Sequence, residues 1–420
     1  MDLTEAGAHR LDAADPLGSF RDQFELPRRD GGEPLIYFCG HSLGPLPHAA
    51  RSLVEAELDT WSRLAIDGHF RDRDPWFTYA ESLAEPTARV VGAEPDEVVT
   101  MNGLTVNLHL LFTTFYRPTR ERYAVLMEAG AFPSDRYAVA SQVREHGLDP
   151  ATAIIRVAPR AGEDLIRSED VEAILAEHGR RIALVWLPGV QFITGQWLDM
   201  ERITAAAHER GALCGWDLAH AAGNVPVRLH DWDADFAVWC TYKYLNSGPG
   251  SIGQAFVHRR HARDTSLPRL GGWWGNAPES RFEMRETYEP RPDAAGWQVT
   301  NPPILALAPL KASLDLFDRA GMVPLRARSE RLTAYLEAQL DARGVGHLIT
   351  PRDPAARGAQ LSLRIGTDAQ AVERALSAAG AIIDFRQPDV IRAAPAPLYA
   401  TFDEVRRFAD MLAWVLAPAA

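Results

Sequence analysis

The chain has 420 residues, of which 46% are apolar and 24% charged, so it can bury a large core and is expected to form two domains. Its net charge of −12 at pH 7 argues against nucleic-acid or anionic-membrane binding, because it offers no counter-charge for phosphates. The three cysteines form no C-x-x-C pair, which is typical of reduced thiols in a cytoplasmic protein. We expect no signal peptide, because the N-terminal residues 1–5 provide neither a positively charged n-region nor an apolar h-region. We expect no membrane span, because no apolar run approaches roughly 18 residues.

The N-terminal part reads as a polar arm followed by a strand, a turn and a helix. Residues 1–34 are polar and helix-like, and a short strand over 35–39 breaks into the turn Gly40-His41-Ser42-Leu43-Gly44-Pro45. This turn is either an ordinary strand-to-helix loop or a segment that faces a substrate. An amphipathic helix is predicted over 49–64. His69 lies in the aromatic-rich loop after it, and alone is more typical of a structural or solvated residue.

Two strand-to-helix transitions follow that could bind a cofactor. A strand over 97–101 leads through Asn102-Gly103-Leu104-Thr105 into a helix, and the free N–H groups at such a helix start bind phosphate. This motif alone is weak, because many α/β turns look similar. A strand over 123–128 leads to Phe132, which could stack on a flat ring, and to Asp135, which could accept a hydrogen bond. The alternative for this segment is a helix cap.

Further short apolar strands are predicted over 154–157 and 182–187, separated by helical stretches. Strands that alternate with helices predict a mostly parallel sheet that is covered on both faces. The fold class expected is therefore α/β.

A lysine and an aspartate follow two later apolar runs. The run 213–216 ends at Asp217, and the run 236–240 leads to Lys243. An amine desolvated at the end of a buried strand is available as a nucleophile or base, as a pyridoxal phosphate (PLP) enzyme requires. The 243 − 217 = 26 residues between them allow a crossover between parallel strands, so both would lie at the edge where open α/β sheets bind ligands. The alternative is a surface lysine and a helix-capping aspartate.

The C-terminal third begins with a long loop and ends in a smaller α/β unit. The loop spans 267–296 and contains Trp273-Trp274, which are expected to cover a ligand or an interface. A long helix is predicted over 304–320. After it, strands are predicted over 359–365, 381–385 and 390–395, with a helix over 368–380. Arg392 lies on one of these strands, and a buried arginine needs an anionic partner. That partner is either an internal carboxylate or the carboxylate of a substrate.

From about Tyr37 to Tyr399 these motifs resemble the kynureninase family. The segments that carry the resemblance are Asn102-Gly103-Leu104-Thr105-Val106-Asn107, Phe132-Pro133-Ser134-Asp135, Asp217-Leu218-Ala219-His220, Tyr242-Lys243-Tyr244-Leu245-Asn246, Asn301-Pro302-Pro303-Ile304 and Arg392 with Ala394-Pro395. The resemblance implies a fold-type-I, PLP-dependent transferase-like α/β fold with a mostly parallel central sheet and a smaller C-terminal α/β domain. It also implies a homodimer, with active sites at the subunit interface, that hydrolyses kynurenine or 3-hydroxykynurenine to an anthranilate and L-alanine.

The resemblance also implies domain boundaries and residue roles. We expect an N-terminal arm over 1–40 that packs on the small domain, a large PLP-binding domain over 41–305 and a small domain over 306–420. Lys243 would bind PLP covalently, beside Tyr242 as a proton donor. The other residues expected to bind PLP are Leu104, Thr105, Phe132, Asp135, Asp217, His220, Tyr242, Trp273 and Asn301. The residues expected to bind the substrate are Arg392 at its carboxylate, His69 and Asn301 at its aromatic ring, and Ser42 and His41 in its pocket. No metal is expected.

Two departures from the family pattern bear on specificity. His41 stands where the family usually has asparagine, which leaves open whether the pocket admits a further ring substituent. Pro188 stands near the cofactor where relatives carry a serine, which removes one polar contact. We expect a preference for 3-hydroxykynurenine, because His69 and Asn301 could both form hydrogen bonds with a ring hydroxyl.

Two other classes of protein share parts of this pattern. One is another fold-type-I PLP enzyme, such as an aminotransferase, desulfurase or lyase. Desulfurases of this type use a cysteine on a mobile loop, whereas all three cysteines here lie in or beside predicted strands. The other is a non-catalytic PLP-binding protein, which would have no need of Lys243, Asp217 and Arg392 together.

Overall fold

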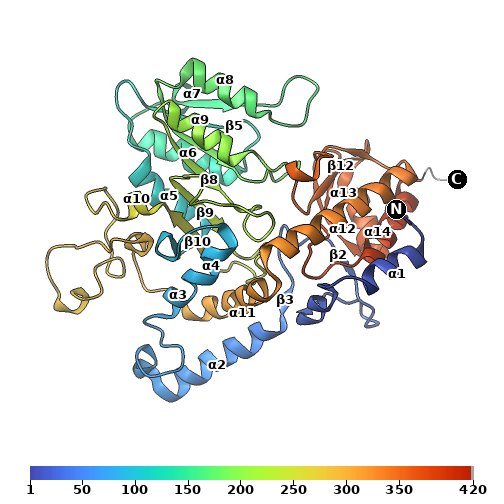
Figure 1. The fold of residues 1–420 in the computed structure, drawn as a ribbon, viewed down its shortest axis with the longest axis horizontal. Coiled ribbons are helices and arrows are strands. Elements are labelled where there is room, and N and C mark those ends of the chain that lie inside the picture. Colours follow the sequence, from blue (N-terminus) through green and yellow to red (C-terminus); the bar gives the residue numbers. More distant parts are fainter. Residues whose placement is uncertain (418–420) are drawn as a thin grey trace.

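The structure is a computed structural model that describes residues 1–417, and its centre is a seven-stranded sheet (Figure 1). In spatial order the strands are β4 (Val98–Thr100), β10 (Gly253–Val257), β9 (Phe236–Cys240), β8 (Leu213–Asp217), β7 (Ile182–Pro188), β5 (Ala124–Glu128) and β6 (Ile154–Val157). Neighbours from β9 to β6 pair in parallel, and β10 runs antiparallel to both β9 and β4. The predicted mostly parallel sheet is confirmed.

The sheet lies between two apolar cores because side chains alternate along each strand. In β5, Ala124 and Leu126 contribute to one core, and Val125 and Met127 contribute to the other. One face is covered by α5 (Leu104–Phe115) and α6 (Pro133–Glu145), and the other by α4 (Ala84–Val91), α8 (Ser168–His178), α9 (Met200–Glu209) and α11 (Ile304–Ala320). Because both faces are buried, the strands read as continuous apolar runs in the sequence.

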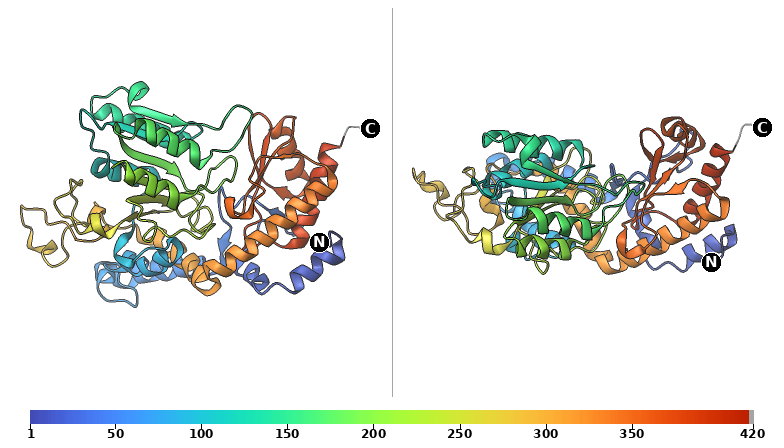
Figure 2. Two further views of the ribbon diagram at one scale, coloured as in Figure 1. Left: turned by 45° about the horizontal axis from the view of Figure 1, so that its top comes forward. Right: turned by 90° about the horizontal axis from the view of Figure 1, so that it is seen from above.

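Further helices and strands lie outside the central sheet. They are β1 (Phe24–Glu25), β3 (Leu46–Pro47), α2 (His48–Leu64), α3 (Tyr79–Ser82), α7 (Pro150–Ala153) and α10 (Arg259–Ala262). Short 3-10 helices span Gly18–Gln23, Ala65–His69, Pro95–Glu97, Arg281–Glu283, Ala294–Trp297 and Pro354–Ala356. The loop of residues 264–293 projects away from the sheet in the views of Figures 1 and 2.

The C-terminal part is a second, smaller layered unit. Its antiparallel sheet has the order β11 (His347–Leu348), β12 (Leu361–Arg364), β15 (Val390–Ala393) and β14 (Asp384–Arg386). Its helices are α12 (Met322–Arg343), α13 (Ala369–Ala379) and α14 (Phe402–Leu416). The start of the chain joins this unit, because α1 (Glu5–Ala13) packs on α14 and β2 (Ile36–Tyr37) pairs in parallel with β13 (Ala381–Ile382). The division of the chain at residues 40 and 305 stays a prediction.

One predicted strand of this unit is divided in the structure. The sequence predicts a single strand over 381–385, but residues 381–382 pair with β2 and residues 384–386 pair with β15. The separation matters for function because the second pairing places Asp384 directly opposite Arg392. The apolar pattern of residues 381–385 does not reveal that the pairing partner changes within this segment, because one of the partners, β2, comes from the N-terminal part of the chain.

Candidate active site

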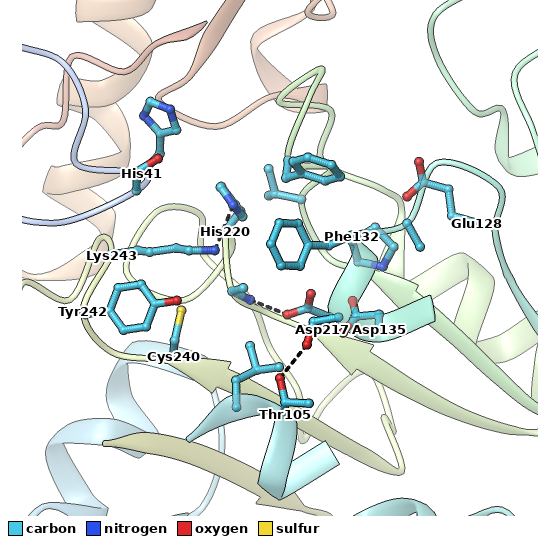
Figure 3. A pocket seen from close by; sticks show the side chains of 18 of the residues that line it. His41, Thr105, Glu128, Phe132, Asp135, Asp217, His220, Cys240, Tyr242 and Lys243 are labelled. Atoms are coloured by element: carbon cyan, nitrogen blue, oxygen red, sulfur yellow. Dashed lines mark hydrogen bonds between the residues drawn. The ribbon is translucent and has the colours of Figure 1, made fainter. Parts of the chain in front are cut away.

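A cavity of about 390 Å³ opens at the carboxyl ends of β5, β7, β8 and β9 and reaches the C-terminal unit (Figure 3). It brings together most of the residues expected to act: His41, Ser42, Leu104, Thr105, Phe132, Asp135, Asp217, His220, Tyr242, Lys243 and Arg392. Pro188 also lines it. The ligand-binding edge of an open α/β sheet is therefore where the sequence pattern placed it.

Lys243 extends into this cavity from the turn after β9. Its Nζ lies 3.0 Å from Nε2 of His220 (Figure 3). Burial, and then the charge of Lys243, lower the pKa of His220 well below its usual value, so the imidazole is neutral and its Nε2 can accept a hydrogen bond from the Lys243 Nζ. Gly44 lets the turn of residues 40–45 approach this lysine, since a Cβ there would lie 2.5 Å from the Lys243 carbonyl oxygen.

Two carboxyl groups lie together at the end of β8. Asp217 is the last residue of that strand, and its Oδ1 accepts a hydrogen bond of 2.7 Å from the Ala219 N–H. Asp135 lies in the first turn of α6, where burial and then the charge of Asp217 raise its pKa well above its usual value. Two such groups cannot both be ionised without a positive partner. A protonated ring nitrogen supplies that partner, so the pair fits the pyridine of PLP.

The start of α5 forms another side of the cavity. Its N-cap is Gly103, and the first turn of any helix leaves its N–H groups without intrahelical partners. Gly253 packs against this turn, since a Cβ there would lie 3.0 Å from the Leu104 nitrogen. The Thr105 hydroxyl lies 2.8 Å from that of Ser134. Free N–H groups, the positive end of the helix dipole and two hydroxyls fit a phosphate group.

Two aromatic residues have surroundings that suit their expected roles. Phe132 is 45% exposed, and Lys243 Nζ lies 6.0 Å from its ring centroid, so one face of the ring is open to the cavity. Burial raises the pKa of the Tyr242 hydroxyl, which therefore keeps its proton at neutral pH and is able to donate it. The ring of Phe192 packs against that of Phe132 in a T-shaped arrangement, with 5.3 Å between the two ring centroids.

Arg392 lies on β15, in the wall of the cavity that the C-terminal unit provides, where it is fully buried. Its Nη2 donates to Asp384 and, at 3.4 Å, to the Ser42 hydroxyl, and its Nη1 donates to the Phe192 carbonyl oxygen. Arg386 donates to the other carboxylate oxygen of Asp384 at 2.5 Å. Of the two anionic partners that the sequence allowed for Arg392, an internal carboxylate is therefore present, namely that of Asp384. Two guanidinium groups against one carboxylate still leave one positive charge facing the cavity.

Sequence reasoning missed three ionisable residues of this cavity and its wall, namely Glu128, Asp384 and Arg386. Glu128 is the last residue of β5, and its Oε1 accepts a hydrogen bond of 2.9 Å from Gln191. Burial raises the pKa of Glu128 to about 7, and its Oε2 has no hydrogen-bond partner among residues 1–417. The sequence pattern could have identified Glu128, because an apolar strand that ends in a carboxylate is also the pattern that indicates Asp217.

Three expected site residues lie outside this cavity in a single chain. His69 ends a 3-10 helix and packs edge-on against Trp76, with 5.2 Å between ring centroids. Asn301 is exposed, and Trp273 is 42% exposed in the projecting loop, where its Nε1 donates to the Arg281 carbonyl oxygen at 3.3 Å. Large apolar side chains near them are also exposed, among them Phe70, Phe282 and Met284.

The chain is similar to known proteins over nearly its whole length. A kynureninase of Myxococcus xanthus is 52% identical over 411 residues, which cover 97% of this chain and 96% of that protein. The chain belongs to the kynureninase family. A kynureninase of Salinispora tropica is 53% identical over 416 residues, covering 97% and 96% of the two chains. A family model described as the kynureninase C-terminal domain matches residues 325–412. Kynureninases are hydrolases of the kynurenine pathway that act on carbon–carbon bonds in ketonic substances, EC 3.7.1.3.

Solved structures of lower identity show the same fold. The apo cysteine desulfurase of Thermococcus onnurineus NA1 superposes with a TM-score of 0.75 at 17% identity, covering 91% of this chain and 94% of that one. A mutant of C-DES with glycine covalently linked to its PLP cofactor superposes with a TM-score of 0.78 at 18% identity, covering 94% and 98%. The predicted fold type I is confirmed. Across residues 1–417, none of the helices combines the length and apolar character needed to span a bilayer.

Proposed function

We propose that this kynureninase uses PLP bound in the cavity to hydrolyse 3-hydroxykynurenine in preference to kynurenine, giving 3-hydroxyanthranilate and L-alanine. The observation that carries the proposal is one cavity that holds Lys243 beside a neutral His220, the Asp217–Asp135 pair, and the positively charged Arg392. In the hydrolysis, the Cβ–Cγ bond of the substrate breaks. The hydroxyl of water goes to the ketone carbon, which becomes the anthranilate carboxyl group, and a proton goes to Cβ, which becomes the methyl group of alanine.

Each part of the cavity has a role in this reaction. Bound PLP serves as the electron sink for the carbons of the amino acid. Asp217 would hold the pyridine nitrogen, the first turn of α5 with Thr105 would hold the phosphate, and Phe132 would pack on the ring. Lys243 would bind the cofactor, and its Nζ, with His220 as its neighbour, would take the α-proton of the substrate. Tyr242 would donate the proton that Cβ of the alanine part receives, which its protonated hydroxyl allows.

We propose a homodimer in which a second copy completes each site. His69 and Asn301 lie outside the cavity of their own chain. Phe70, Phe282 and Met284 are exposed, and contact of their apolar side chains with water is unfavourable. A two-fold arrangement that covers this surface would bring the residues of one copy to the cavity of the other. We also infer a cytoplasmic location, because the three cysteines are free thiols in the described part of the chain.

Mixed dimers test whether sites are shared between copies. We expect Lys243→Ala and the double variant His69→Ala with Asn301→Ala each to lose most turnover when alone. Co-expression at equal levels should recover about a quarter of wild-type turnover, because half the dimers are mixed and each contains one intact site. The measurement is kcat of the purified mixture. A control mixture of wild-type chains with chains that carry all three changes should keep about a quarter of wild-type turnover if sites are shared, and about half if each chain holds a complete site. No recovery in the first mixture, or half of the turnover in the control, would contradict shared sites.

Ring preference tests the substrate assignment. His69 and Asn301 can each form a hydrogen bond with a ring hydroxyl, and an unsubstituted ring would leave them without that partner in a desolvated site. We expect kcat/KM for 3-hydroxykynurenine to exceed that for kynurenine by about tenfold or more, which corresponds to about 1.4 kcal/mol. His69→Trp with Asn301→Thr should remove this ratio. A wild type that prefers kynurenine, or a ratio that survives the double change, would show that these residues do not bind the hydroxyl.

A desulfurase-like reaction is the alternative that shares this fold. Cys240 lines the cavity, so a thiol is present close to the cofactor position. It is fixed at the end of a central strand, and burial raises the pKa of its thiol, which disfavours the nucleophilic thiolate. The cysteine therefore lacks both the mobility and the ionisation that such a reaction requires.

A further inference from the structure

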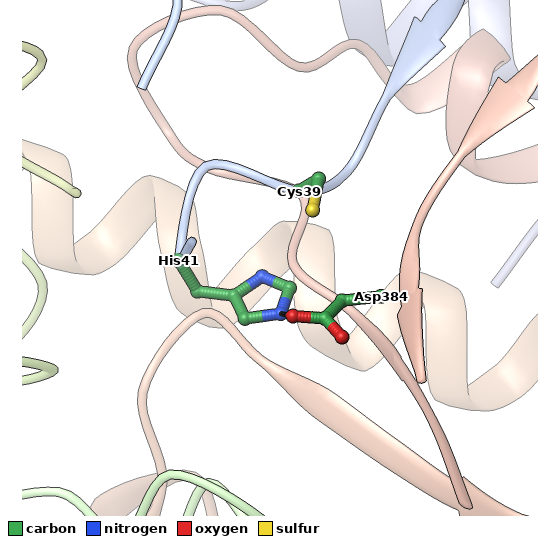
Figure 4. A group of neighbouring side chains, drawn as sticks. All are labelled: Cys39, His41 and Asp384. Carbon is green, nitrogen blue, oxygen red and sulfur yellow. Dashed lines mark ion pairs between the residues drawn. The ribbon is translucent and has the colours of Figure 1, made fainter. Parts of the chain in front are cut away.

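His41 is the residue of the cavity whose polar atoms are least satisfied. The side chain is fully buried and lines the cavity, yet neither ring nitrogen has a hydrogen-bond partner among residues 1–417. Its Nε2 lies 3.7 Å from Oδ2 of Asp384, which is too long for a hydrogen bond (Figure 4). A buried polar group without a partner destabilises the protein, so a partner is expected from a ligand.

The position of His41 identifies the end of the substrate that it faces. Its ring lies 6.3 Å from that of His220, which is the neighbour of Lys243 (Figure 3). On its other side is Asp384, which is bound by Arg392. An amino-acid substrate places its nitrogen at the lysine and its carboxylate at the arginine, so a residue between the two faces the α-carbon and not the aromatic ring.

The charges around His41 favour a neutral donor. Burial, and then the charge of Arg392, lower the pKa of this histidine well below its usual value, and the charges of Arg386 and Lys243 act in the same direction. Asp384 is the opposing charge, and it already accepts hydrogen bonds from both arginines and from Ser42. The imidazole therefore has one N–H to donate and adds no charge.

A metal ion is the competing ligand for these side chains. The ligand atoms of Cys39, His41 and Asp384 all lie within 4.8 Å of one another. A divalent cation there would meet the guanidinium groups of Arg386 and Arg392, and burial raises the pKa of the Cys39 thiol to about 11, so that thiol keeps its proton. The one positive charge left over in this cluster attracts an anion.

We propose that His41 donates its ring N–H to the α-carboxylate of the substrate, which it binds together with Arg392. The inference rests on the proposed function, because it requires an amino-acid substrate. Two guanidinium groups and one internal carboxylate leave a single positive charge, which one substrate carboxylate neutralises. A neutral third donor then fixes the orientation of that carboxylate without a second uncompensated charge.

The two reaction products distinguish a role of His41 at the substrate α-carboxylate from a role at the aromatic ring of the substrate. L-Alanine carries the α-carboxylate without the ring, and anthranilate carries the ring without the amino-acid part. We expect His41→Phe and His41→Leu to weaken L-alanine binding about tenfold or more, measured by the visible absorbance of bound PLP. Inhibition by anthranilate should change less than about twofold, and His41→Asn should restore much of the alanine affinity, since an amide also donates.

Controls separate the ways in which this inference can fail. His48→Phe removes a half-exposed histidine seven positions along the chain, and it should leave both affinities unchanged. If wild type, His41→Phe and His41→Leu bind L-alanine equally, the role proposed for His41 is wrong, whereas the proposed function is unaffected. Loss of anthranilate inhibition with alanine binding intact would assign His41 to the ring. A wild type that gives no spectral response to L-alanine would overturn the proposed function and, with it, this role.

Discussion

Replacing Lys243 with alanine is expected to remove the visible absorbance of protein-bound PLP and all turnover of kynurenine and 3-hydroxykynurenine, while the fold stays intact. In the proposed mechanism the amine binds the cofactor and takes the substrate α-proton, and in this structure it points into the cavity 3.0 Å from His220. The change removes a side chain from the cavity wall and leaves β9 and its core contacts in place. Absorbance spectroscopy and anthranilate release measure the two effects.

The chain provides a matched control, because Lys311 is its second and last lysine. Lys311 lies on α11, away from the cavity, where its Nζ is 3.7 Å from a carboxylate oxygen of Asp315. Lys311→Ala should keep both the absorbance and the turnover. Reduction with borohydride followed by peptide mass spectrometry should find PLP on Lys243 alone, a result that does not depend on activity. Label on Lys311, or normal turnover of Lys243→Ala, would refute the assignment.

Arg392→Ala is expected to raise KM for both substrates with less effect on PLP binding. The variant loses the guanidinium that we propose binds the substrate carboxylate, and it leaves Asp384 with Arg386 and Ser42 as partners. The expected loss is about 2–4 kcal/mol, the range for removing one partner of a buried charge pair. This corresponds to a rise in KM of about 30- to 700-fold. Steady-state kinetics and the PLP dissociation constant measure the two effects.

Arg392→Lys distinguishes charge from geometry, since lysine keeps the charge but cannot form two parallel hydrogen bonds. It should recover only part of the affinity. Arg364 is a suitable control because it lies on the neighbouring strand β12 and binds Asp164 outside the cavity. Arg364→Ala should leave KM near its wild-type value. An unchanged KM for Arg392→Ala would mean that Arg392 serves only its internal pairing with Asp384.

Several elements could be predicted from the sequence to the residue. Strands β6, β8 and β9 and helix α11 match the predicted ranges 154–157, 213–217, 236–240 and 304–320. Short apolar runs between polar or glycine-rich segments define such strands without help from the rest of the chain. The pairing of β8 with β9 also followed from the sequence, because a 26-residue crossover favours parallel neighbours. That pairing is what places Asp217 and Lys243 at one edge.

Other features depend on partners that are remote in the sequence. Strand β10 reads locally as part of a glycine-rich turn, and it is a strand because β4 and β9 pair with it on both sides. The division of residues 381–386 between two sheets depends on β2, which lies some 345 residues earlier (381 − 36). Asp384 faces Arg392 only as a result of that division.

The role of a residue could therefore be predicted from the sequence where a single strand places its side chain. It could not be predicted where several elements meet to place it. Lys243 and Asp217 follow directly from the strands that carry them. The position of His41 between Lys243 and Arg392 depends on the N-terminal segment, the large sheet and the C-terminal unit together. Tertiary packing brings such residues to one cavity, and their pKa values follow from burial and from charges that no local pattern encodes.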